Sequence, residues 1–313
     1  MRYIKTIISI MIIALILTAC TQENSNEGIL NVSDEWSAKL INQPPVILFD
    51  YDKNDNKDRF AFDYVLYDMQ LQERKKEYIC TVPYNKSGGG IYFGKDRTRI
   101  MFASSGGKGA ADVDLVTGDV SFVELGENID SPKYVNENVI SYIKEGKIYV
   151  YKKNQERHLL IGQCQQPDYN LDTYDWFSDG KSILYVSKQE DGDYALAKKN
   201  LVADTSEVLL KHEKQIYFKL SNSETKVMLR CNGKLYLYDM ETNTILNIEL
   251  PDIYESRIYS ICFSPDDKFI VFSCVIDDGS YLNSYEIWIV EIDTLNQTMI
   301  YNKKKASEAA VVW

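Results

Sequence analysis

The chain is poor in the residues that most often build catalytic or metal sites. It has only two histidines in 313 residues, so a site that needs three imidazoles from one chain is excluded. Its six cysteines form no Cys-x-x-Cys pair, which argues against zinc, and the Gly-x-Ser-x-Gly motif of serine hydrolases is absent. We therefore predict that the protein is not an enzyme.

Basic residues are also in deficit, with 35 Lys and Arg against 46 Asp and Glu, for a formal net charge of −11. This balance disfavours nucleic acid as a partner, because affinity for a duplex rests on many Lys and Arg contacts to phosphate. What the chain does have is a hydrophobic content of 45% and many aromatic residues, among them 23 Tyr and 11 Phe. Such a composition indicates a folded protein rich in β-strands.

The first 20 residues have the layout of a secretion signal. Arg2 and Lys5 precede an apolar run at 7–17, and small residues then lead to Cys20. The tetrad at 17–20 (LTAC) resembles the bacterial lipobox, which implies cleavage before Cys20 and fatty acylation of this residue. We expect a signal peptide over 1–19 and a protein held by its lipid in the cell membrane, facing the extracytoplasmic side. The alternative is an uncleaved anchor with an incidental cysteine.

Residues 20–45 are expected to form the lipidated cysteine and a polar tether, and the folded domain is expected to span 46–313. The stretch 21–32 contains several Asn, Ser and Gly residues, as linkers do. Ser33 could begin a short helical turn that runs to about Ile41. The pair at 44–45 is Pro-Pro, which ends the turn because a residue before proline is pushed toward extended geometry.

A repeat of 39 to 44 residues organises the rest of the chain. Its clearest copies are FSPDDKFIVFS at 263–273 and FSDGKSILYVS at 177–187, each with a short strand, an acidic turn and an apolar strand. A period of about 40–45 residues is typical of the four-stranded blade of a β-propeller. The first buried residues after the turns are expected to be Phe60, Ile100, Val139, Ile183, Val227 and Ile270.

The two clearest copies resemble the repeat of TolB-type β-propellers, whose pattern is roughly Trp/Phe-Ser-Pro-Asp-Gly-Lys before a buried strand. This resemblance, which runs from about residue 46 to the end, implies an all-β fold with a single propeller of four-stranded blades. Six blades fit the repeats best, and seven is the alternative. The segment 309–313 (AAVVW) reads as one more innermost strand, which either closes the ring on the first blade or is left over from a seventh.

A polar loop at 50–58 (DYDKNDNKD) is the candidate metal site. Oxygen side chains alternate along it, and alternate spacing in a turn can direct several oxygens to one hard cation such as Ca²⁺. The loop resembles inserted calcium loops of propeller repeats, but Asp55 replaces the expected glycine. We predict a structural calcium site here, with a solvated hairpin as the alternative. Its proposed ligands are Asp50, Asp52, Asn54 and Asp58.

The resemblance implies a domain that binds other molecules. TolB-type domains act as interaction modules in the cell envelope, so we expect a monomeric lipoprotein whose propeller binds an envelope protein or a glycan without catalysis. The alternative is a propeller enzyme that acts on envelope or extracellular glycans through carboxylates in its channel. The odd number of cysteines after Cys20 leaves at least one free thiol, and their pairing is open: Cys80, Cys164, Cys231, Cys262 and Cys274.

Overall fold

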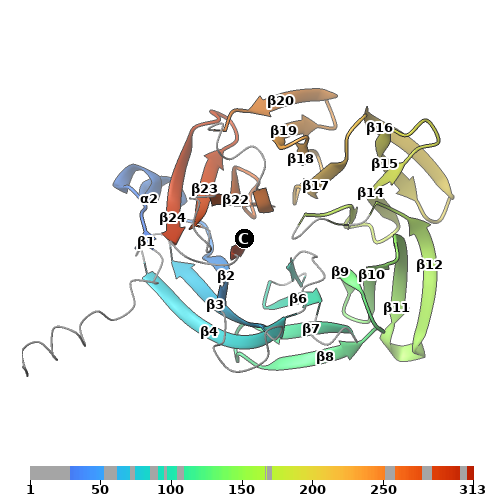
Figure 1. Cartoon of the computed structure of the whole chain (residues 1–313), viewed down its shortest axis with the longest axis horizontal. Helices are drawn as coiled ribbons and strands as arrows, with labels where there is room; N and C mark the ends of the chain where they lie inside the picture. Colours follow the sequence, from blue (N-terminus) through green and yellow to red (C-terminus); the bar gives the residue numbers. More distant parts are fainter. Residues whose placement is uncertain are drawn as a thin grey trace, which may run out of the picture.

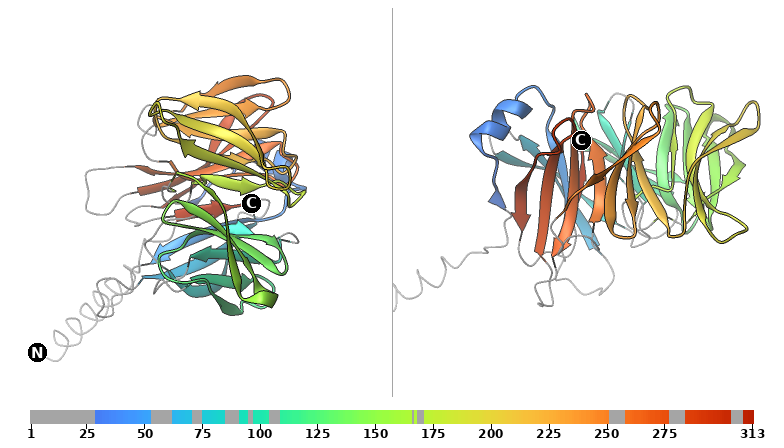
Figure 2. Two further views of the ribbon diagram at one scale, coloured as in Figure 1. Left: turned by 90° about the vertical axis from the view of Figure 1, so that its right-hand side faces the viewer. Right: turned by 90° about the horizontal axis from the view of Figure 1, so that it is seen from above.

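The computed structural model shows a ring of antiparallel sheets around a central axis, with successive sheets following one another in chain order (Figure 1). Seen from the side, the sheets lie next to one another and the ring has the shape of a disc (Figure 2). In β3, in β4 and at one end each of β1, β2, β22 and β25 only the backbone is described. The described residues are 29–52, 62–70, 75–84, 91–94, 97–103, 109–165, 167, 171–250, 258–276, 284–303 and 309–313.

The described strands form five four-stranded sheets and one five-stranded sheet. The first three sheets around the ring are β25 (Ala309–Val312), β2 (Val46–Asp52), β3 (Phe62–Gln70) and β4 (Lys75–Tyr84); β5 (Tyr92–Phe93), β6 (Arg99–Ala103), β7 (Gly109–Asp114) and β8 (Val120–Glu124); β9 (Asp130–Asn136), β10 (Val139–Lys144), β11 (Lys147–Lys152) and β12 (Arg157–Gln163). The 3₁₀ turn η1 (Lys153–Gln155) joins β11 to β12.

The other three sheets continue the ring in the same order. They are β13 (Tyr174–Trp176), β14 (Ser182–Lys188), β15 (Tyr194–Asn200) and β16 (Thr205–His212); β17 (Ile216–Leu220), β18 (Lys226–Cys231), β19 (Lys234–Asp239) and β20 (Thr244–Ile248); β21 (Ile258–Phe263), β22 (Phe269–Ile276), β23 (Ser284–Glu291), β24 (Gln297–Lys303) and β1 (Ile29–Leu30). The predicted all-β propeller of four-stranded blades is thus confirmed in its architecture. The prediction that every blade has four strands is wrong for one sheet. Five sheets have four strands each, and the last sheet has β1 as a fifth strand.

The last strand in sequence, β25, belongs to the same sheet as the first long strand, β2. Their register pairs Ile47 with Val312 and Asp50 with Ala309, antiparallel. The segment 309–313 therefore closes the ring and is not the remnant of a seventh blade. The first of the six expected buried residues was misplaced. The innermost strand of the first sheet comes from the far end of the chain, so β2 is the second strand of that sheet. Ile47, and not Phe60, therefore matches the expected buried residues of the other sheets.

Residues from Ile29 to Pro45 pack on the propeller, so this part of the predicted tether belongs to the folded unit. β1 pairs with the outer edge of β24, and helix α2 (Asp34–Leu40) follows it, with the Ser33 hydroxyl accepting a hydrogen bond from Trp36 N as its N-cap. The short helix predicted after Ser33 is therefore confirmed. Of the helices in the described ranges, none has the length and apolar character needed to cross a membrane.

The hydrophobic core is divided among the gaps between neighbouring sheets. A cluster of buried side chains fills each gap around the ring, including the gap between the last sheet and the first. In that last gap α2 contributes Trp36 and Leu40, and Trp313 lies against Phe269 with 6.1 Å between ring centroids. The indole of Trp313 also donates a hydrogen bond to the carbonyl of Pro44, 2.8 Å away. Burial between the faces of adjacent sheets thus holds the ring together.

At two places in the ring, the turn between the first and second strands of a sheet is hydrogen-bonded to the equivalent turn of the preceding sheet. In the turn after β21, the carboxylate of Asp267 accepts hydrogen bonds from the backbone N–H groups of Asn222 and Ser223, at 2.8 and 2.6 Å. In the turn after β17, the carboxylate of Glu224 accepts one from the backbone N–H of Ser178. At these two places an acidic turn of the repeat therefore bonds its sheet to the one before it.

Truncating a buried side chain of the closing strand should weaken the whole domain. Val311 is 1% exposed, and Val311→Ala is expected to lower the free energy of unfolding by about 2 kcal/mol, because methyl groups leave the joint between the last and first sheets. Val116→Ala is the control, since this side chain is 79% exposed and its loss should change little. Urea unfolding followed by circular dichroism measures both, and equal effects of the two variants would contradict this account of the closure.

Candidate functional site

The innermost strands surround a cavity of about 300 Å³ at the centre of the ring. Residues of the innermost strands of all six sheets line it, and so do residues of some of the turns that follow them. Its wall combines aromatic groups, such as Phe93 and Trp176, with charged groups and small polar side chains, such as Ser178 and Asn222. A concave site with a few convergent polar groups is the usual form of a ligand pocket.

The repeat explains which residues reach this cavity. In four sheets the turn after the innermost strand begins at Gly94, Phe177, Ser221 or Ser264, whose carbonyl accepts a hydrogen bond from the N–H three residues later. The residue two positions before each of these turn residues lines the cavity, at the same place in each of the four innermost strands. In chain order these four residues are Tyr92, Asp175, Lys219 and Cys262.

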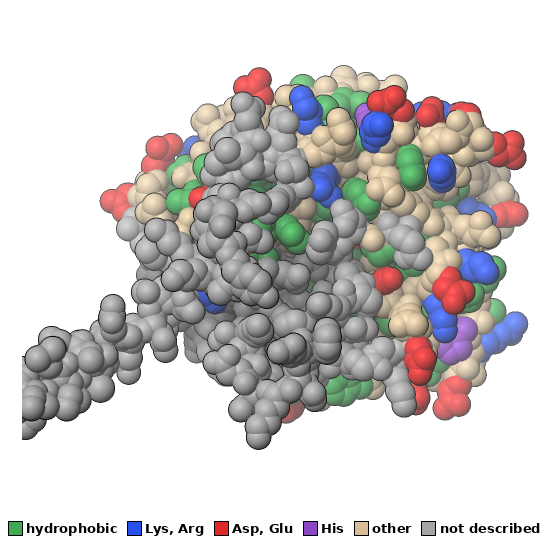
Figure 3. All heavy atoms as spheres, in the orientation of Figure 1, with side chains coloured by type: hydrophobic (Ala, Val, Ile, Leu, Met, Phe, Trp, Pro, Cys, Tyr) green, Lys and Arg blue, Asp and Glu red, His purple; other side chains and the backbone are tan. Residues whose placement is uncertain are grey.

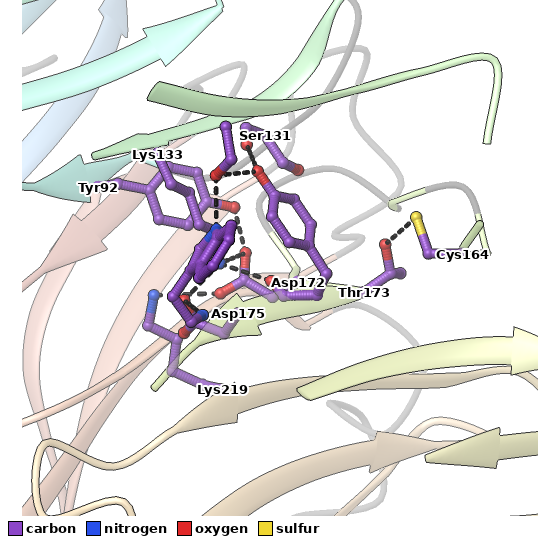
Figure 4. A network of polar contacts seen from close by, with 11 residues as sticks. Tyr92, Ser131, Lys133, Cys164, Asp172, Thr173, Asp175 and Lys219 are labelled. Atoms are coloured by element: carbon purple, nitrogen blue, oxygen red, sulfur yellow. Dashed lines mark hydrogen bonds and ion pairs between the residues drawn. The ribbon is translucent and has the colours of Figure 1, made fainter. Parts of the chain in front are cut away.

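Asp172 is the centre of a buried polar network beside the cavity (Figure 4). Its carboxylate oxygens lie 3.2 Å from the ammonium of Lys133 and 3.1 Å from that of Lys219, and the hydroxyl of Tyr92 donates a hydrogen bond to it. Lys133 also lies 3.0 Å from Asp175. The backbone carbonyl of Asp172 accepts a hydrogen bond from the N–H of Phe218, so the residue bridges two neighbouring sheets.

These groups are held tightly because little solvent reaches them. The side chains of Asp172 and Lys133 are only 2% and 4% exposed. The Lys133 ammonium donates a hydrogen bond to the carbonyl of Tyr174 at 2.7 Å, and it lies over the ring of Tyr92 with 4.2 Å to the centroid. Two ammonium and two carboxylate groups balance each other, so the buried network is neutral overall.

A second series of hydrogen bonds lies next to this network. The Tyr174 hydroxyl donates to the carbonyl of Ser131 at 2.8 Å, and the hydroxyls of Ser141 and Tyr174 lie 3.0 Å apart. The indole of Trp176 donates to the Ser141 hydroxyl at 2.8 Å. Tyr174 and Trp176 lie on β13, whereas Ser131 lies on β9 and Ser141 on β10, so the position of Trp176 in the cavity wall is fixed by two sheets.

The pKa values of these groups are shifted in the direction that keeps the network intact. Burial raises the pKa of Asp172, but the charges of Lys133 and Lys219 outweigh it and hold this pKa below its usual value. Burial lowers the pKa of Lys219, but Asp172 and Asp175 outweigh it and raise this pKa to about 12. Burial, with Asp172 nearby, raises the pKa of Tyr92 well above its ordinary value. None of these three groups is therefore poised to exchange a proton near neutral pH.

The residues proposed to bind calcium are only partly within the described structure. Asp50 and Asp52 lie on β2, where their backbone alone is described, while Asn54 and Asp58 lie outside the described residues. The flanking strands β2 and β3 pair as the hairpin that the sequence predicts. No group of three or more His, Cys, Asp or Glu side chains within the described ranges could hold a metal ion, and the calcium site stays a prediction.

The cysteines and histidines fall where the sequence indicated. Cys20 lies outside the described residues, and only the backbone of Cys80 is described. Three of the free cysteines are buried in strands, as expected for small hydrophobic residues. These are Cys231, Cys262 and Cys274, and Cys164 is free and half-buried. Both histidines lie on outermost strands, β12 and β16, far in each sheet from the strand that lines the cavity.

Neither a family model nor a curated protein sequence matches the chain. Among solved structures, one described as TolB from Agrobacterium tumefaciens matches with a TM-score of 0.60 at 12% identity, over 85% of this chain and 91% of that one. TolB from Acinetobacter baumannii matches with a TM-score of 0.51 at 12% identity, over 93% of this chain and 88% of that one. The fold is that of a TolB-type propeller.

A structure of a nidogen/laminin complex also contains a similar chain, with a TM-score of 0.58 at 6% identity, over 86% of this chain and 98% of that one. At such identities the likeness concerns the fold alone, since one propeller architecture carries many unrelated functions. The function of this TolB-type propeller has to be argued from its own cavity.

Neutralising Asp172 should destabilise the protein and change how its stability depends on pH. Asp172→Asn leaves the buried ammonium of Lys133 and the half-buried ammonium of Lys219 without their shared partner, and the free energy of unfolding should fall by about 3 kcal/mol at neutral pH. Since the folded pKa lies below the unfolded value, this contribution is complete above about pH 4 and is lost as the pH falls through the folded pKa. The acid limb of the wild-type stability curve should therefore flatten in the variant.

Asp204→Asn is the matched control, because Asp204 is 83% exposed and forms a surface ion pair with Lys199. Urea unfolding at a series of pH values measures all three proteins. A loss for Asp172→Asn no larger than that for Asp204→Asn would show that the network does not stabilise the ring.

Proposed function

We propose that this protein is a membrane-anchored lipoprotein of the cell envelope whose propeller binds a protein or glycan partner at the central cavity, without catalysis. The observation that carries the proposal is the cavity itself, beside which the charges of Lys133, Asp172 and Lys219 are already satisfied by one another. Such a site offers surface, hydrogen-bonding groups and aromatic side chains to a ligand, while Tyr92, Asp172 and Lys219 keep their charge states near neutral pH.

The charges of the outer surface favour binding at the cavity over binding through a broad charged surface. On the face of the ring shown in Figure 3, acidic and basic side chains are interspersed among the coloured residues and form no large patch of one sign there. The net charge of −11 adds a general repulsion of polyanions. A partner that inserts a short segment or a few sugar units into the cavity fits both features. We expect the protein to act as a monomer.

A glycan-cleaving enzyme is the second candidate, because Asp172 and Asp175 both lie within ion-pair distance of Lys133. Paired carboxylates can cleave glycosides when one holds a proton at neutral pH. The pKa of Asp172 is lowered, which opposes the role of general acid. Binding without catalysis is therefore the better supported reading.

Obstructing the cavity should prevent capture of the partner. Ser178 is exposed and lines the cavity, so Ser178→Trp should fill part of it without touching the core. Cross-linking on intact cells, followed by mass spectrometry, should recover at least tenfold less of the wild-type protein's partner with this variant. Ser206→Trp is the control, because Ser206 is exposed on the outermost strand β16 and its variant should capture normally. Equal capture by both variants would place the partner elsewhere.

Fatty acylation at Cys20 can be tested by metabolic labelling with a fatty-acid analogue. Wild-type protein should carry the label, and Cys20→Ala should lose it, because the thiol is the predicted acceptor of the lipid. Cys164→Ala removes a different free cysteine and should stay labelled. Label that persists in Cys20→Ala would refute the lipoprotein assignment.

A further inference from the structure

One turn of the repeat differs from its equivalents in charge. The turns after β5, β13, β17 and β21 share a backbone, in which the third residue after the turn residue has a positive φ. That position holds Gly180, Glu224 and Asp267 in three of the turns, with φ of 61°, 60° and 55°. In the turn after β5 it holds Arg97, with φ of 59°. This left-handed conformation is uncommon for a side chain as large as arginine.

The acids at this position bond the turn of the preceding sheet. Glu224 accepts from the backbone N–H of Ser178, and Asp267 accepts from those of Asn222 and Ser223. A guanidinium has no acceptor and cannot make such a bond. Arg97, like Gly180, therefore does not make the bond that Glu224 and Asp267 make at this position, and the surroundings of its side chain indicate another use.

The Arg97 side chain lies in the wall of the central cavity. Its guanidinium carbon is 4.3 Å from the centroid of the Phe93 ring, and burial lowers the pKa of the group. Within the described residues, no carboxylate lies in ion-pair distance of it. Arg99, two residues further on, shows the contrast, since it is paired with Asp112 at 2.9 Å and with Asp114 at 3.6 Å. Arg97 is a partly desolvated cation in a cavity, and the described part of the chain supplies no carboxylate to pair with it.

We propose that Arg97 is the anchor for a carboxylate of the ligand that enters the cavity. This inference rests on the proposed binding function and adds the ligand's chemical class. Stacking on Phe93 occupies one face of the guanidinium and leaves its N–H edge for in-plane acceptors, which a carboxylate supplies in pairs. The other cations of the cavity, Lys133 and Lys219, are committed to Asp172 and Asp175.

The aromatic wall gives the rest of the ligand a place beside that carboxylate. Phe93 and Trp176 are both half-buried and line the same cavity as Arg97. An acidic residue of an extended peptide and a uronic acid of an oligosaccharide both present a carboxylate next to a surface that can lie on an aromatic ring. The shared requirement is the carboxylate, and the source is decided by experiment.

Two matched pairs of probes test the proposal by isothermal titration calorimetry on the purified full-length chain. Tetraglutamate is compared with tetraglutamine, and a β-1,4-linked tetraglucuronate with cellotetraose. One acidic probe should bind about tenfold or more tighter than its neutral counterpart, and Arg97→Gln should abolish that preference while Arg97→Lys keeps part of it. Which pair shows the preference identifies peptide or glycan as the source.

Arg157→Gln is the control for net charge, because it removes the same charge from an exposed position on β12 and should leave the preference intact. Urea unfolding of each variant ensures that only folded proteins are compared. The proposal is overturned if neither acidic probe binds at millimolar concentration, if acidic and neutral probes bind equally, or if Arg97→Gln keeps the preference.

The outcome separates this inference from the function on which it rests. If Ser178→Trp abolishes capture of the cellular partner but Arg97→Gln has no effect on either assay, the cavity binds a partner and the carboxylate anchor is wrong. If Ser178→Trp leaves capture intact, the proposed function fails as well.

Discussion

The pairing of β25 with β2 is the contact on which the rest of the structure depends. It converts an arc of sheets into a ring, in which each sheet buries both faces against neighbours and no sheet face is left at an open end. The N-terminal segment reinforces the same joint from outside, where Trp36 and Leu40 pack on the last sheet. Without closure the innermost strands could not surround an axis, and the cavity would have no defined shape.

The centre of the ring is specified by polar contacts and its walls by apolar ones. Apolar packing between sheets is tolerant of small shifts, whereas the bonds from Asp172 to Lys133, Lys219 and Tyr92 fix three sheets relative to one another. Burying the charges of Lys133 and Asp172, and partly burying those of Asp175 and Lys219, costs desolvation energy, so this network adds less to stability than its number of contacts suggests. Its main effect is to hold the aromatic wall of the cavity in one arrangement.

Much of the fold could be predicted from the sequence because the repeat is local. The FSPDDKF and FSDGKS segments each encode a strand, a turn and a strand within a dozen residues, and 309–313 was readable as an innermost strand. The first sheet was harder, since its strands come from both ends of the chain and a search for local repeats misplaced its first buried residue.

The site was missed for a related reason: Tyr92, Lys133 and Asp172 are about 40 residues apart and meet only once the ring is closed. Aligning the turns and marking the residue two positions earlier would have found Tyr92, Asp175, Lys219 and Cys262.

The position of β25 also has a consequence for how the molecule acquires its shape. The inner edge of β2 cannot pair until Val312, the partner of Ile47, has been synthesised 265 residues later. Loop closure over so long a separation is entropically slow, and an unpaired strand edge is open to wrong pairings meanwhile. The first sheet is therefore completed last, and the newly made chain passes through a long interval in which every other sheet can form while the ring is still open.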